Sequence, residues 1–128
     1  VPLQMYADAE LLVFQNRFDD AFVKLDSIKM QFPKHGLEDD ILYLKAKVNT
    51  KQRKYEGAAE LYTKIMQEFP EEIRADNSMF ALAQLYENQL NNKEEAMRLY
   101  EKIFIDFSGS TFAVEARKRF RILRGDNI

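Results

Sequence analysis

The sequence predicts an all-α protein made of three stacked helical hairpins and a closing helix. A block of 16 residues occurs three times, at residues 18–33, 55–70 and 93–108. The fourth residues of these blocks, Ala21, Ala58 and Ala96, are 37 and 38 residues apart. Self-similarity at such a period is the signature of repeats built from paired helices. Valine, isoleucine and threonine form no alternating runs, so we expect no strand.

The middle block shows why each copy is expected to be a helix. Residues three or four apart share one face of a helix. This spacing places five apolar residues on one face and charged residues on the other, which predicts an amphipathic helix of about four turns. The apolar residues are Ala58, Tyr62, Ile65, Met66 and Phe69. The alanine is expected where a second helix approaches closely.

The whole chain, residues 1–128, is expected to form one domain. The predicted helices cover about residues 3–15, 18–31, 38–50, 55–69, 72–90, 93–107 and 111–124. They form repeats at about residues 2–35, 38–71 and 72–109, followed by a capping helix at about 110–124. Pro33 and Pro70 should end their helices, because the residue before proline is pushed out of the α region. After the third block, Gly109 is expected to end the helix in a left-handed conformation.

The connections between the paired helices are predicted to be short. Ala9 and Ala46 each precede the opening aromatic of the next helix by nine residues. In the third pair the interval is ten, so we expect Asn91 and Asn92 to take up one extra residue in the turn. Three carboxylates, at residues 38–40, lie in the first turn of a helix, where the helix dipole favours them.

The last predicted helix has the features of a cap at the end of the stack. Ser110 is expected to be its N-cap. One side carries the apolar residues Phe112, Ala116, Phe120 and Leu123. The other side carries the basic residues Arg117, Lys118, Arg119, Arg121 and Arg124. A polar outer face on the terminal helix is what a stack of repeats requires for solubility.

Composition excludes several classes of function. The formal charge is −2 and there is no cysteine, so neither a strongly basic nucleic-acid binder nor a thiolate metal site is indicated. His35 is the only histidine, and one nitrogen ligand does not make a metal site. No catalytic motif is present, and the Arg-Gly-Asp tripeptide at residues 124–126 is explained by a glycine that ends a helix. No cofactor is expected.

The repeat columns resemble the tetratricopeptide repeat, a helix–turn–helix unit of about 34 residues. In the central copy Ala46, Tyr55, Ala58, Tyr62 and Pro70 match the family's small, aromatic and proline positions. The resemblance implies a right-handed α–α superhelix that binds other proteins. The tryptophan favoured in the family's first helix is absent, and Ser108 stands where the third proline would be.

The long period and the Phe-Pro endings are similar to repeats of bacterial envelope proteins, such as the lipoprotein of the outer-membrane barrel-assembly machinery and the periplasmic coordinator of the Tol-Pal system. This resemblance implies a periplasmic or outer-membrane-associated protein, with the cytoplasm as the alternative. The chain looks most like the C-terminal end of a longer repeat protein of Bacteroidetes type. Because it opens at Val1, already in a helical pattern, we expect a fragment or a processed form. No apolar run approaches the roughly 20 residues needed to span a bilayer.

The resemblance places a partner on the concave surface formed by the first helix of each pair. Counting back from the second helices gives a column of rings, Tyr6, Tyr43 and Phe80. Polar neighbours one turn away complete the predicted site: Glu10, Lys47, Gln84, Asp40 and Asn77. Such a strip would suit an extended or helical peptide. The alternative is that the rings are half-buried spacers between neighbouring helices.

The favoured function is therefore a non-catalytic scaffold that holds a protein or peptide. One alternative is a structural segment of a longer solenoid, able to form a homodimer through its N-terminal end. Another is a binder of an anionic partner through the basic surface of the last helix, formed by Arg117, Lys118, Arg121 and Arg124.

Overall fold

The computed structural model describes residues 1–33, 36–70 and 73–126, and it is all-helical over these residues. The helices are α1 (Pro2–Phe14), α2 (Phe18–Gln31), α3 (Glu38–Lys51), α4 (Tyr55–Glu68), α5 (Ile73–Asn88), α6 (Lys93–Asp106) and α7 (Ala113–Arg124). Each end lies within two residues of its predicted position. The predicted fold class is confirmed.

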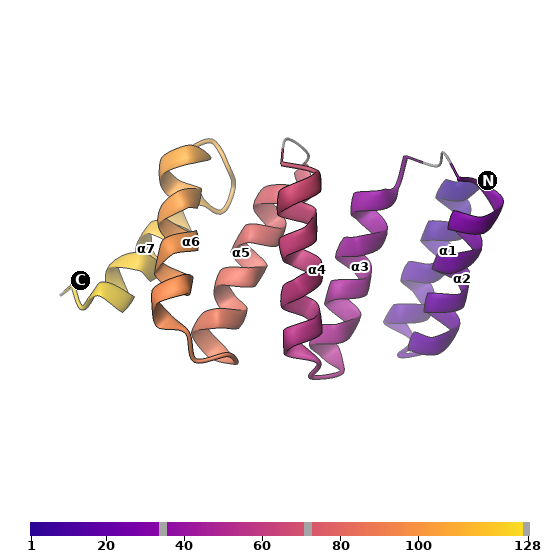
Figure 1. Ribbon diagram of the computed structural model, residues 1–128, viewed down its shortest axis with the longest axis horizontal. Coiled ribbons are helices and arrows are strands. Elements are labelled where there is room, and N and C mark those ends of the chain that lie inside the picture. Colours follow the sequence, from indigo (N-terminus) through magenta and orange to yellow (C-terminus); the bar gives the residue numbers. More distant parts are fainter. Residues whose placement is uncertain (34–35, 71–72, 127–128) are drawn as a thin grey trace.

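The helices pack as successive hairpins along one direction. α1 packs on α2, α3 on α4, and α5 on α6, while α7 covers the end of the stack against α6. Figure 1 shows the elements following one another in chain order along the long axis, with the two termini at opposite ends. The first helix of each following hairpin contacts both helices of the preceding one: α3 contacts α1 and α2, and α5 contacts α3 and, more extensively, α4. Each end of the array is left with an outward side.

The turn inside each hairpin has the same backbone geometry. Asn16, Arg53 and Asn91 have φ values of 61°, 62° and 51°, and each lies two residues before the next helix. Asparagine tolerates this left-handed region better than other non-glycine residues. The third turn has one residue more than the other two, because α5 ends at Asn88 and α6 begins at Lys93. The predicted insertion is confirmed.

The second helix of each hairpin ends at a phenylalanine whose backbone has left the α region. Phe32, Phe69 and Phe107 have φ values of −134°, −132° and −127°. Proline follows the first two, as predicted. The prediction for Gly109 is wrong, because its φ is not positive and the backbone leaves the helix two residues earlier, at Phe107.

The prediction that Ser110 is the N-cap of the last helix is also wrong. α7 begins at Ala113 with Phe112 as its N-cap. The Ser110 hydroxyl instead donates to the Asp76 carboxylate at 2.7 Å and accepts from the Phe112 N–H at 3.1 Å. Ser110 therefore ties the turn before α7 to α5.

The positions that hold alanine in all three repeats form the centre of the core. The six alanines of the first and second helices, Ala9, Ala21, Ala46, Ala58, Ala83 and Ala96, are at most 1% exposed. One apolar cluster joins α1 and α2 to Ile41, Leu44 and Val48 of α3. A second cluster runs from Leu42 and the remaining side of α3 through α7. α3 thus belongs to both clusters and couples the first hairpin to the rest.

Candidate functional site

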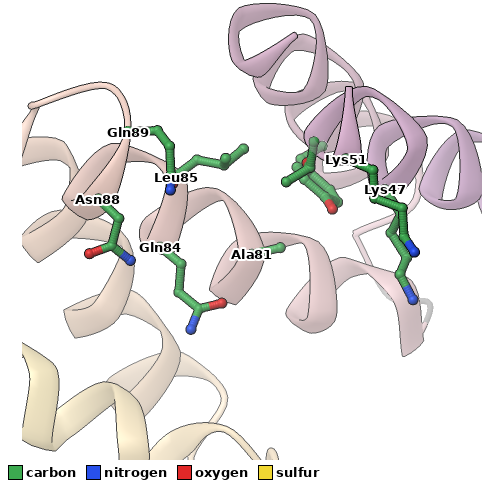
Figure 2. A pocket seen from close by; sticks show the side chains of 9 residues that line it. Lys47, Lys51, Ala81, Gln84, Leu85, Asn88 and Gln89 are labelled. Atoms are coloured by element: carbon green, nitrogen blue, oxygen red, sulfur yellow. The ribbon is translucent and has the colours of Figure 1, made fainter. Parts of the chain in front are cut away.

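A cavity of about 410 Å³ opens between α3 and α5. This is within the range typical of ligand sites, which are roughly 300–1,000 Å³. We call it the α3–α5 groove. Its lining residues are Lys47, Thr50, Lys51, Tyr62, Ala81, Gln84, Leu85, Asn88 and Gln89. Figure 2 shows Lys47 and Lys51 on one wall and Ala81, Gln84, Leu85 and Asn88 on the opposite one.

The groove exists because a small residue occupies one column of the repeat. Ala81 follows Leu44 by 37 residues and takes its place in the third repeat. Leu44 is 6% exposed and fills the space between α3 and the first hairpin. Ala81 has only a methyl group, so the corresponding space between α5 and α3 stays partly open. Leu85 also lines this space and is only 4% exposed.

Tyr62 of α4 forms the floor of the groove. Its ring is 3% exposed and packs edge-on against Tyr43, with ring centroids 5.8 Å apart. Burial raises the pKa of Tyr62 to about 12, and a hydrogen bond with Thr50 only partly opposes this effect. The phenol is therefore neutral at physiological pH and offers the groove an apolar ring rather than a charge.

The groove is electrostatically positive. Lys47 and Lys51 are its only charged lining residues, and the other polar groups are hydroxyls and side-chain amides. Among the residues that the structure describes, neither lysine forms an ion pair, although the Lys47 ammonium lies 5.8 Å from the centre of the Tyr43 ring. Two unneutralised cations beside several amides favour a ligand that carries carboxylates.

A polar network lies beyond the groove, toward the N-terminal ends of α3 and α5. The Arg74 Nε donates to the Asp40 carboxylate at 2.9 Å, and its guanidinium lies 4.6 Å from the centre of the Tyr43 ring. The Tyr6 hydroxyl donates to the Asp40 carbonyl at 3.2 Å. Burial raises the pKa of Tyr6 to about 12, and the Glu10 charge adds to this effect. These contacts hold the first helices of successive hairpins in register.

The comparison with family models decides what kind of array this is. The tetratricopeptide-repeat model matches residues 40–72 and 77–110, which together make up more than half of the chain. The chain belongs to the tetratricopeptide-repeat family. None of the curated proteins compared with this tetratricopeptide array is similar enough to count as a match. Tetratricopeptide repeats are in general scaffolds for protein–protein interaction, and the family is generally non-catalytic.

The structure separates the eight predicted partner-binding residues into three groups. Lys47 and Gln84 line the groove of the tetratricopeptide array. Tyr6 and Phe80 are each 9% exposed, and Phe80 stacks on Phe112 with ring centroids 4.7 Å apart. The other four neither line the groove nor are buried: Tyr43, Asp40 and Asn77 are half-buried and Glu10 is exposed. The two end residues of the predicted ring column, Tyr6 and Phe80, are therefore packed in the core.

Seven lining residues were absent from the sequence prediction. They are Thr50, Lys51, Tyr62, Ala81, Leu85, Asn88 and Gln89. Thr50 and Lys51 follow Lys47 by one helical turn, and Asn88 follows Gln84 by the same step. Extending the predicted strip by one turn toward the end of each first helix would have included them. The size difference between Leu44 and Ala81 was the signal for the cavity itself.

The basic surface of α7 is smaller than the sequence indicates. Arg119 turns inward, where it forms an ion pair with Glu87, whose side chain is 9% exposed and also accepts from the Tyr100 hydroxyl. Arg117 lies over the Phe104 ring, at 5.5 Å. Arg121 and Arg124 both form ion pairs with Asp126 at the C-terminal turn. Gly125 ends α7 with a φ of 93°, as predicted.

Over the part of the chain that the structure describes, no group of three or more metal-ligating side chains occurs. His35, the only histidine, lies outside the described residues. Within the same residues, no helix combines the length and apolar character that crossing a bilayer would need.

Proposed function

We propose that the α3–α5 groove holds an extended or helical segment of a partner protein and favours segments that carry acidic side chains. The observation that supports this most is the open cavity with two lysines and no carboxylate in its lining. The apolar groups of Tyr62, Ala81 and Leu85 offer contact area, and the amides of Gln84 and Asn88 can pair with a peptide backbone.

Two of the predicted site residues that do not line this groove support it from beside it. Tyr43 supports Lys47 and Arg74 through its ring. Asp40 anchors Arg74 and so holds α5 at its distance from α3. In this proposal the protein binds without catalysing a reaction. The family resemblance suggests that the partner belongs to a bacterial envelope assembly.

The experiment is a selection of peptides from a random displayed library on the 128-residue protein, followed by calorimetry with the selected peptides. We expect enrichment of aspartate and glutamate, and at least about tenfold weaker binding to the double variant Lys47→Glu, Lys51→Glu. Lys29→Glu, an exposed change of the same kind on α2, is the matched control and should bind like the unaltered protein. Equal affinity of the double variant would overturn the proposal.

A further inference from the structure

The junctions between successive hairpins share one electrostatic arrangement. At each junction, a cation on the following helix meets a carboxylate of the preceding hairpin. The pairs are Lys45–Asp26, Arg74–Asp40 and Arg119–Glu87. A cation of the following helix also lies over a ring of the preceding hairpin: Lys45 over Phe22, Arg74 over Tyr43 and Arg117 over Phe104. At each junction the preceding hairpin therefore offers one carboxylate and one ring to cations of the following helix.

The outward side of α1 differs from the equivalent sides of α3 and α5. Leu11 occupies the column of Val48 and Leu85, which are 1% and 4% exposed, yet Leu11 is 55% exposed. Leu3 and Phe14 lie on the same side and are 69% and 82% exposed. We call Leu3, Ala7, Leu11 and Phe14 the α1 face. Exposed leucine and phenylalanine side chains in one stripe mark an interaction surface.

The charges beside the α1 face indicate what can cover it. α1 contains no lysine or arginine, and Asp8 stands in the column of Lys45. At the first junction Lys45 meets Asp26, so a preceding hairpin of the same kind would set a carboxylate against Asp8. A second α1 face carries the same charges and would repel both Asp8 and Glu10. A basic helix with exposed apolar side chains is the complementary surface.

The outward side of α7 is such a surface. Val114 is 83% exposed and Ile122 is 38% exposed, and they are eight residues apart, as Leu3 and Leu11 are. Lys118 lies between them on the same side. α7 carries five basic residues and one acidic residue, whereas α1 carries two acidic residues. We call Val114, Lys118, Arg121 and Ile122 the α7 face.

We propose that the α1 face binds the α7 face of a second copy of this chain, so that copies associate end to end. The apolar pairs would pack against each other, and Lys118 and Arg121 would approach Asp8 and Glu10. Such a contact uses two different surfaces, so one copy leaves a free face at each end and the assembly can grow. The α3–α5 groove takes no part in it and remains accessible in every copy.

Sedimentation of the 128-residue protein tests this proposal. The weight-average mass should rise above the 15.1 kDa of one chain as concentration increases. It should fall back when salt is added, because exposed ion pairs are screened. A mass of one chain at every concentration would overturn the proposal.

Two variants distinguish end-to-end association from a symmetric dimer. Leu11→Asp removes the α1 face and Val114→Asp removes the α7 face, and each variant alone should remain a monomer. Mixed in equal amounts they should form a dimer and grow no further, because the mixture retains one intact face of each kind. Association of either variant alone, or no association in the mixture, would contradict the proposal.

One control and one charge variant complete the test. Val23→Asp alters a valine of α2 that is 66% exposed and belongs to neither face, so it should associate like the unaltered protein. Lys118→Glu changes only charge and should weaken association at least about tenfold at low salt. Far-ultraviolet circular dichroism should show the same helix content in all variants. An unchanged affinity of Lys118→Glu would remove the electrostatic part of the argument and, with it, the choice of α7 as the partner surface.

Discussion

Two junctions in this molecule have the same helical arrangement and different contents. At the first junction, α3 packs on α1 and α2, and Leu44 fills the space between them. At the second junction, α5 packs on α3 and α4, and Ala81 stands in the same repeat column and leaves the groove open. A repeat backbone can therefore leave a closed joint or an open groove, and the side chain in this one column differs between the two junctions.

The two junctions also differ in their polar contacts. Lys45 and Asp26 meet at 3.3 Å at the first junction, and the Asp26 side chain is 64% exposed. Arg74 and Asp40 meet at 2.9 Å at the second, and both side chains are 28% exposed. Less solvent reaches the second pair, so its charges are screened less. The second junction, which is the more open one, thus has the stronger ion pair.

The largest expected effect comes from opening the first junction. Leu44→Ala should lower the free energy of unfolding by about 2–4 kcal/mol, because it removes buried methyl groups and leaves a cavity. Urea denaturation followed by circular dichroism measures this. Met30→Ala, at a side chain that is 82% exposed on α2, should change stability by less than about 0.5 kcal/mol. Equal effects of the two substitutions would show that Leu44 does not fill the junction.

The ion pairs at the two junctions should contribute unequally to the free energy of unfolding. Arg74→Ala should cost about 1–2 kcal/mol, since it removes a half-buried ion pair and a cation–π contact with Tyr43. Lys45→Ala at the first junction should cost less than about 0.5 kcal/mol, as for exposed pairs. Equal losses would mean that the two ion pairs contribute alike.

Alkaline pH should affect both junctions similarly. Tyr6 at the first and Tyr62 at the second keep their protons up to about pH 12, whereas an ordinary tyrosine has a pKa of 10.0. The unfolded chain therefore loses these protons first, and the free energy of unfolding falls as pH rises from 10 toward 12, by about 2 kcal/mol per tyrosine. The variants Tyr6→Phe and Tyr62→Phe should each lose that share of the pH dependence. A pH profile identical to that of the unaltered protein would contradict the raised pKa values.

The smallest effect concerns the turns that precede the second helices. The Asn92 side chain accepts a hydrogen bond from the Glu95 N–H at 3.2 Å, whereas the N-caps Arg17 and Lys54 form no side-chain cap. Asn92→Ala should cost about 0.5–1 kcal/mol, and Lys54→Ala should cost nothing measurable. A loss at Lys54 as large as that at Asn92 would argue against a capping role.

Sequence periodicity predicted the helices, the buried alanines and the extra residue in the third turn, because these depend on the fixed spacing of residues along a helix. It failed where contacts join distant residues. Arg119 was placed on the outer side of α7, but Glu87, 32 residues earlier, draws it inward. Ser110 has the residue type of an N-cap, yet Asp76, 34 residues earlier, holds its hydroxyl.

The site was predicted in part for a related reason. Spacing located Lys47 and Gln84 on facing helices, and both line the groove. It could not distinguish a ring that packs, such as Phe80, from a ring that is available to a partner. The cavity depends on a difference in side-chain volume between two repeats, and only a comparison of Leu44 with Ala81 along their shared column reveals it.

The central claim is that the space left by Ala81 is the binding site of this scaffold. The most direct test is calorimetry of a library-selected peptide with the variant Ala81→Leu, in which a leucine fills the groove as Leu44 fills the first junction. We expect the variant to remain folded, with binding weakened at least about tenfold. Unchanged affinity in a folded Ala81→Leu protein would contradict the claim and place the binding site elsewhere on the array.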